Sequence, residues 1–253
     1  LMEAMHLARL GPTEAVVRHP SKVLAEKKLD EAINHWMNGL KVAFDIHLKE
    51  NVIKSSVEII TRIVKISLDA NLKDRKELLR VIIKGVECIL NIEERFRVLG
   101  MIAYELRSMD KFELAVAIYD HIENEIEAYL SKGDGDVNVL YANILIGKAN
   151  TLNILRNFDE ALEVCIKIEN YLRRLIDLYP EKVAFKTLLS EALMSKAMTL
   201  DNLRRFNRAL DCYYEAEDIL WRLIRSGEKG LESQLAKLML NIGYALTALK
   251  RYN

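Results

Sequence analysis

The stretch Leu140–Leu162, LYANILIGKANTLNILRNFDEAL, recurs 48 residues later as Leu188–Leu210, LLSEALMSKAMTLDNLRRFNRAL. Eleven of the 23 aligned positions are identical, and the agreement continues into the segment that follows. A fainter copy precedes them, because Phe112 stands 46 residues before Phe158. Self-similarity at a fixed period is the signature of a tandem repeat. The chain is therefore predicted to be an array of about five units of 46 to 48 residues.

Each unit has the pattern of two helices. Leu145, Ala149 and Leu152 are spaced by four and three residues, which places them on one face of a first helix. Phe158 then opens a second helix, whose first turn is acidic and therefore suits the positive end of the helix dipole. Ala161 is small enough to let the two helices approach closely. Helix pairs that bury only one stripe need neighbours, so the units are expected to stack.

The joints between units carry most of the helix-breaking residues. We expect joints at Lys132–Asp136 and Ser226–Gly230, and a helix end before Pro180. Further back, Leu29–Ala32 has the same shape as Phe112–Ala115, and Leu72 could be a degenerate copy between them.

Composition independently favours helix. The 253 residues include only 3 Pro and 10 Gly, where average usage would give about 13 and about 18. A β-sandwich would need more turn residues, and a disordered chain could not be 51% hydrophobic. The 37 basic residues balance 37 acidic ones, which argues against a nucleic-acid surface or a polybasic membrane anchor.

Location and redox state follow from equally simple features. The longest uncharged stretch that we find, Leu238–Leu249, is far shorter than the roughly 20 residues of a membrane span, and no secretory signal is recognisable. A cytoplasmic location is therefore expected. Cys88, Cys165 and Cys212 form no CxxC pair, which predicts reduced, packed thiols and no metal site. A single glutamine among many charged residues is typical of a heat-adapted source.

No catalytic motif emerges. The sequence contains no HExxH, no Gly-rich phosphate loop and no GxSxG elbow. Glu3 and His6 form one ExxH pair, whereas a di-iron bundle needs two. The cluster around His121 lies on an acidic helix that a solvated face explains more simply than catalysis does. Cys88 lacks a nearby histidine, so a small buried side chain explains it better than a nucleophile does. We therefore expect a protein without enzymatic activity, bound cofactor or metal.

Ala149, Leu152, Phe158 and Ala161 resemble a tetratricopeptide repeat (TPR), whose signature places a small residue at position 8, a large one at 11, an aromatic one at 17 and alanine at 20. The resemblance is good over residues 94–253 and poor before them. One departure is length, because the usual repeat has about 34 residues. The excess falls in a longer second helix and the joint after it.

The resemblance implies an all-α fold, a right-handed α/α superhelix of antiparallel helix pairs. Its concave face, lined by first helices, would bind an extended peptide or a helix of a partner protein. Carried over by repeat position, the residues that would contact the partner are Arg97, Tyr104, Arg107, Asn143, Asn150, Asn153, Met194, Met198, Asp201, Asn202, Lys237 and Tyr244. Met101, Ile146, Glu191 and Leu240 would complete the lining.

Two groups within this lining have a chemical meaning of their own. Asn143, Asn150 and Asn153 share roughly one helix face, and their amides could hold the backbone of an extended peptide. Solvation, or hydrogen bonds to a neighbouring unit, would explain them equally simply. Met194 and Met198 could form an adaptable apolar surface for a partner helix, with core packing as the alternative.

The ends of the array suggest a second kind of contact. Residues 1–20 follow no repeat phase and are treated as a separate segment, whereas residues 21–253 form one repeat domain whose last unit is incomplete or capping. If the last helix is uncapped, its exposed apolar face would favour a homo-oligomer; this face consists of Leu235, Leu238, Ile242, Leu246 and Leu249. The functional hypothesis is a protein-binding scaffold. The alternative is a ligand-sensing regulatory module of a larger signalling or transcription protein.

Overall fold

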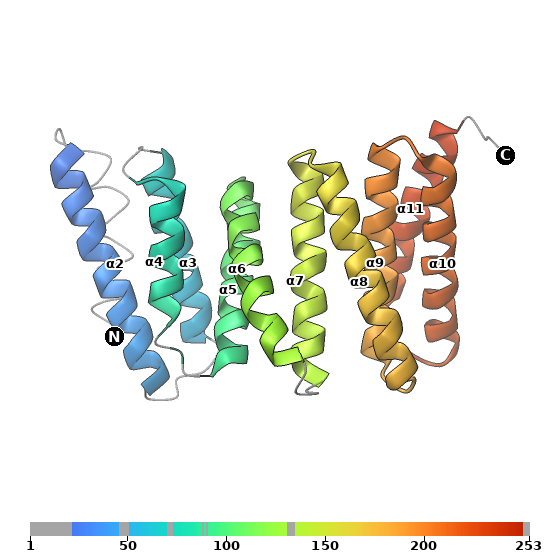
Figure 1. Cartoon of the computed structure of the whole chain (residues 1–253), viewed down its shortest axis with the longest axis horizontal. Helices are drawn as coiled ribbons and strands as arrows, with labels where there is room; N and C mark the ends of the chain where they lie inside the picture. Colours follow the sequence, from blue (N-terminus) through green and yellow to red (C-terminus); the bar gives the residue numbers. More distant parts are fainter. Residues whose placement is uncertain are drawn as a thin grey trace. The chain divides into compact units, whose positions relative to one another are not determined.

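A computed structural model describes residues 22–45, 51–69, 73–87, 89, 91–130 and 135–249. The predicted segment 1–20 lies outside these residues. The described residues form ten α-helices (Figure 1). Their bounds are α2 (Lys22–Asp45), α3 (Asn51–Asp69), α4 (Arg75–Val86), α5 (Ile92–Ser108), α6 (Phe112–Leu130), α7 (Gly135–Ile154), α8 (Phe158–Leu178), α9 (Val183–Asn202), α10 (Phe206–Arg225) and α11 (Glu232–Ala248).

The helices fall into two compact units, divided after Glu125 within α6. In the first unit α2 packs against α3 and α4, and α5 packs against α3 and α4. Gly85 of α4 lies directly against the ring of Trp36, where an added Cβ would come within 2.0 Å of the indole. Only glycine fits there, so α2 and α4 can approach this closely because residue 85 has no side chain.

The repeat-like segment Leu29–Ala32 lies inside a helix and not at the start of one. Residues 22–45 form one continuous helix, α2, and Leu29 is fully buried in its middle. The segment carries no Pro or Gly ahead of Leu29 to stop a helix, so the helix that surrounds the repeat-like pattern simply continues through it.

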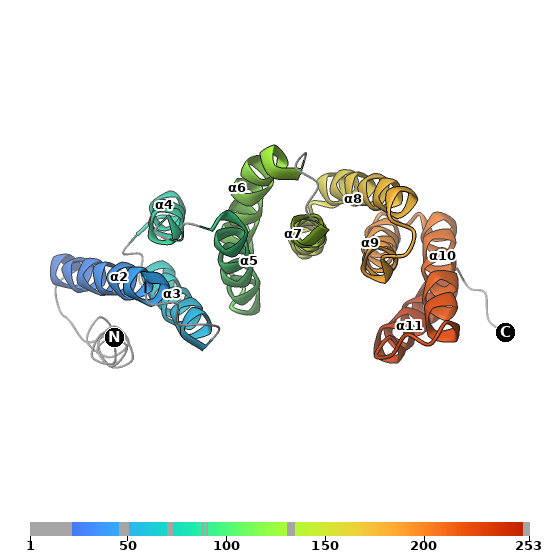
Figure 2. The ribbon, with the colours of Figure 1, turned by 90° about the horizontal axis from the view of Figure 1, so that it is seen from below.

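The second unit shows the predicted helix pairs clearly. The second helices α8 and α10 begin at Phe158 and Phe206, and every helix from α7 to α11 packs against the next (Figure 2). The first helices also contact each other, α7 with α9 and α9 with α11. Ala149 and Ala161 are fully buried, as are their counterparts in the next repeat. Small residues at these positions let the helices pack closely, as the sequence predicted.

The turn inside each pair is closed by the backbone. Arg156 and Arg204 adopt the left-handed conformation, with φ of 61° and 57°, and Asp110 takes the same conformation at the equivalent position. The amide of Asn157 donates to the carbonyl of Leu152 across this turn, which is a Schellman-type helix end. Glycine usually occupies such a position, so helix packing, rather than residue preference, determines the turn here.

The last helix is covered on its apolar face. Leu235, Leu238 and Ile242 are buried where α11 packs against α10 and α9. The structure therefore does not expose these three residues, and the homo-oligomer expected of an uncapped helix stays a prediction. The exposed apolar side chains of α11 are Met239, Leu240 and Tyr244. Among the described residues, no helix is both long enough and apolar enough to cross a membrane.

Candidate functional site

In the first unit, the structure separates the three predicted binding residues by exposure. Tyr104 is 64% exposed, and Arg97 is exposed and pairs with Glu94 on its own helix. Arg107 is half-buried and hydrogen-bonds Tyr119, whose pKa burial raises. Arg107 therefore supports the contact between α5 and α6, and Tyr104 is the most accessible member of the predicted set in this unit.

In the second unit, two of the three predicted peptide-binding asparagines hold the repeats together instead. Asn153 is only 8% exposed, and its amide donates to Thr199 Oγ1 of the next first helix at 2.8 Å. Asn150 Oδ1 accepts a hydrogen bond from Ser195 at 2.9 Å. Both bonds join α7 to α9, so the reading of Asn153 as an accessible partner contact is corrected. Asn143 is exposed and donates to its own helix.

The accessible apolar surface lies on α9 and α11. Met198 is 40% exposed and Met194 is half-buried, so this pair is only partly explained by core packing. On α11, Leu240 and Tyr244 are exposed, and Tyr244 reaches 73%. Leu240 and Tyr244 occupy the same repeat positions as Met194 and Met198, 46 residues later. The four residues are called the apolar stripe below.

The polar members of the lining surround this stripe. Asp201 is half-buried and accepts a hydrogen bond from Tyr213, while Asn202 beside it is exposed. Burial raises the pKa of Asp201, because the buried carboxylate has lost hydration. Burial also raises the pKa of Glu191, against the opposing attraction of Lys237 on α11. The stripe is therefore edged by a mixture of carboxylates, amides and one lysine.

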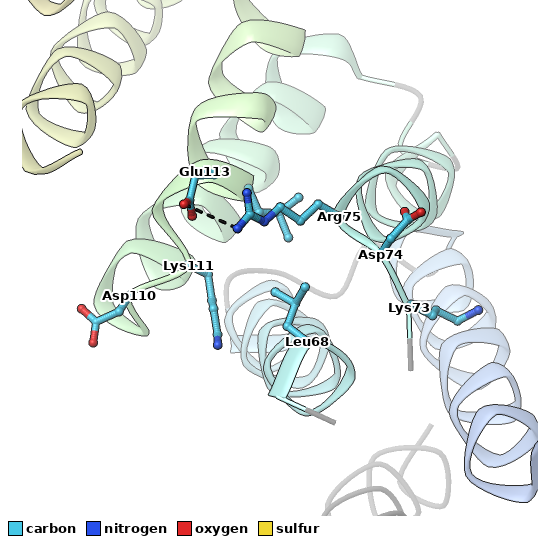
Figure 3. Close-up of a pocket in the computed structure, with 8 residues that line it drawn as sticks. Leu68, Lys73, Asp74, Arg75, Asp110, Lys111 and Glu113 are labelled. Atoms are coloured by element: carbon cyan, nitrogen blue, oxygen red, sulfur yellow. Dashed lines mark ion pairs between the residues drawn. The ribbon is translucent and has the colours of Figure 1, made fainter. Parts of the chain in front are cut away.

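Two pockets lie away from these residues. The pocket in the first unit, about 420 Å³, is lined by Leu68, Leu114 and six charged residues from the starts of α4 and α6 (Figure 3). Its three cations are already paired: Arg75 with Glu113 at 3.5 Å, Lys111 with Asp69, and Lys73 with Asp30 and Glu77. This pocket consequently offers no free positive charge for an anionic ligand.

The second pocket, about 500 Å³, lies between α8, α9 and α10 and was not anticipated from the sequence. Ile176, Leu189, Ile219 and Leu223 provide its apolar lining. The charged lining residues are Arg173, Lys186, Glu215, Asp218 and Arg222, with Ser226 at one end. This volume is in the range of small-molecule sites.

No cluster of metal-binding side chains accompanies these surfaces in the described part of the chain. No group of three His, Cys, Asp or Glu side chains there gathers as metal ligands would. Cys165 and Cys212 are buried free thiols, as predicted. Burial raises the pKa of Cys165 to about 12, which keeps the thiol protonated and unreactive.

Comparisons with known proteins identify the fold. No protein-family model matches the chain, and no curated protein matches its sequence. Among solved structures, BtubC (BKLC) from P. vanneervenii aligns with 88% of this chain and 85% of its own, at 13% identity and a TM-score of 0.53. The apo form of RapI aligns with 100% of this chain and 72% of its own, at 10% identity and a TM-score of 0.51.

A third match, from Podosopora anserina, carries nearly identical TPR-like repeats; it covers 90% of this chain and 97% of its own, at 10% identity and a TM-score of 0.45. Identities this low speak for the fold alone. The fold shared with BtubC and RapI agrees with the helix pairs, the buried alanines and the aromatic residues that open α8 and α10. The described residues therefore have a TPR-like helical repeat fold.

Proposed function

We propose that the protein is a non-enzymatic interaction module that binds a segment of a partner protein along the first helices of its second unit. TPR-like folds are typical of protein-interaction and sensor modules. The observation that carries the proposal is the apolar stripe, Met194, Met198, Leu240 and Tyr244, on two first helices that contact each other. Large exposed apolar side chains that gather in this way are typical of interaction surfaces.

The spacing of the stripe suits a helical or extended segment. Met194 and Met198 stand one turn apart on α9, and their repeat equivalents stand one turn apart on α11. Methionine adapts to differently shaped apolar partners, and tyrosine adds a large contact area together with a hydroxyl. A partner segment would therefore contribute apolar side chains to the stripe and polar ones to its edge.

The edge of the stripe defines the orientation of the partner. Glu191 and Lys237 occupy the same repeat position and attract each other at one end, whereas Asn202 is exposed at the other. Asn150 and Asn153 are excluded from this role, because their side chains bond to α9. We therefore expect the contact mainly on α9 and α11 rather than on α7.

Selection from a displayed library of random peptides tests the proposal. Peptides selected on the full chain would be measured by fluorescence anisotropy against Met198→Glu with Tyr244→Glu. We expect the double variant to weaken binding at least about tenfold, which corresponds to about 1.4 kcal/mol. Tyr214→Glu is the matched control, because Tyr214 is also an exposed tyrosine but lies on the second helix α10.

Two outcomes would contradict the proposal: a library that yields no specific peptide, or peptides that bind the double variant as well as the wild type.

A ligand-sensing role is the second candidate. The specific observation that favours it is the 500 Å³ pocket, which lies between the second helices α8 and α10 and the first helix α9. Both roles need no catalysis.

A further inference from the structure

The stacking of α7 on α8 contains a cluster of aromatic side chains, which we call the filled seam. Tyr141 and Tyr171 meet edge to face, with their ring centroids 5.1 Å apart. The hydroxyl of Tyr171 donates to Asn138 Oδ1 at 2.6 Å. Burial raises the pKa of Tyr171 to about 12, so this hydroxyl remains a donor at neutral pH. The filled seam thus has two rings and a matched donor and acceptor.

The pocket between α8, α9 and α10 is the same place one repeat later, and we call it the open seam. An offset of 48 residues aligns Tyr141 with Leu189 and Tyr171 with Ile219. Both aliphatic residues line the pocket. Each substitution replaces an aromatic ring with a smaller aliphatic side chain at a position that lines the 500 Å³ pocket.

An ion pair shows that the two seams are stacked in the same register. Glu127 of α6 pairs with Lys167 of α8 at 2.5 Å in the filled seam. The equivalent residues Arg173 and Glu215 pair at 2.7 Å in the open seam, with the charges reversed. Because equivalent positions meet in both seams, the pocket results from smaller side chains rather than from a different stacking of helices.

The third aligned position indicates the chemistry of a ligand. Asn138, which accepts the hydrogen bond from Tyr171, is replaced by Lys186 at the pocket. An ammonium group only donates, and Lys186 forms no ion pair with any residue in the described part of the chain. The neighbouring cations Arg173 and Arg222 are paired with carboxylates. A group bound here must therefore accept hydrogen bonds, and negative charge suits it best.

We propose that the open seam binds a small aromatic carboxylate. Its ring lies among Leu189, Ile219 and Leu223, in the space that tyrosine rings fill in the preceding repeat. Its carboxylate accepts a hydrogen bond from Lys186 Nζ. The site is separate from the apolar stripe of α9 and α11. The proposed ligand binding can therefore be tested independently of the proposed partner binding.

Isothermal titration calorimetry of the full chain with phenylacetate tests the site, with phenylacetamide as the neutral isostere. We expect saturable binding of phenylacetate below about 10 mM, at least tenfold weaker binding of phenylacetamide, and a similar loss in Lys186→Gln. Lys229→Gln, in the exposed joint before α11, is the matched control and should bind like the wild type.

The decisive variant, Leu189→Tyr with Ile219→Tyr, introduces the two tyrosines of the filled seam into the open seam. It should retain helical circular dichroism and bind no phenylacetate; Ile219→Tyr alone takes its place if the double variant does not fold. The proposal is overturned if the wild type binds no phenylacetate at about 10 mM, if phenylacetamide binds equally well, or if the filled variant still binds.

Discussion

The filled seam and the open seam are two solutions to the same stacking problem. Both join a second helix to its neighbour through an ion pair at equivalent positions, and both rest on a first helix with buried alanines. They differ in side-chain volume: Tyr141 and Tyr171 against Leu189 and Ile219. The comparison teaches that the shared small and apolar positions determine how repeats stack, whereas a few size differences decide where a cavity forms.

The largest effect is expected from opening the filled seam. Tyr141→Leu with Tyr171→Ile introduces the residues of the open seam, removes two rings and leaves Asn138 without its hydrogen bond. We expect the free energy of unfolding to fall by about 2–4 kcal/mol, as for other large-to-small core substitutions. Urea denaturation followed by circular dichroism measures this loss. A loss below about 1 kcal/mol would mean that the rings contribute little to the stacking.

A smaller effect is expected from the ion pair. Arg173→Glu places a carboxylate beside Glu169 and Glu215, both of which now accept hydrogen bonds from Arg173. We expect a loss of about 1 kcal/mol, because the pair is partly exposed. Adding Glu215→Lys recreates the polarity of Glu127 and Lys167 and should restore most of the stability. Thermal melts of the single and double variants measure the loss and its recovery. If the second change restores no stability, the electrostatic explanation is wrong.

The smallest effect concerns pH. Burial raises the pKa of Glu191, whereas the preceding repeat has the neutral Asn143 at this position. Because the pKa of Glu191 is higher in the folded state, its contribution to stability is fully present below its unfolded-state pKa of about 4.3. This contribution is lost as the pH rises through the pKa of the folded state. Glu191→Gln should therefore melt at a higher temperature than the wild type at neutral pH. The difference should vanish near pH 3. Glu228→Gln, in an exposed joint, serves as the control.

Much of the fold could be predicted because repeats impose regular side-chain sizes. The starts of α8 and α10 at Phe158 and Phe206 follow from the repeat, as do the buried alanines and the breaks at Pro180 and Gly227. The segment Leu29–Ala32 resembles the start of a second helix but lies inside α2, because a short pattern without a breaking residue does not interrupt a helix.

The candidate sites were harder to predict, because they depend on which neighbour a side chain meets. Asn153 has the right spacing for a binding surface, yet its amide is used by Thr199 of the next repeat. The apolar residues of α11 split between a buried stripe on Leu238 and an exposed one on Tyr244. The pocket between α8, α9 and α10 was found only in the structure. The repeat alignment nevertheless shows the difference in side-chain size, because it pairs Tyr171 with Ile219.

The reversed polarity of the two ion pairs also makes the pairing of helices in each seam specific. Lys167 is complementary to Glu127, and Glu215 is complementary to Arg173. A helix pair that skipped its neighbour would bring Glu215 against Glu127, and the repulsion of two carboxylates would oppose that arrangement. The similar repeats are thus not interchangeable. Charge favours the native pairing of neighbouring repeats and disfavours exchange of a helix pair between two copies of the chain.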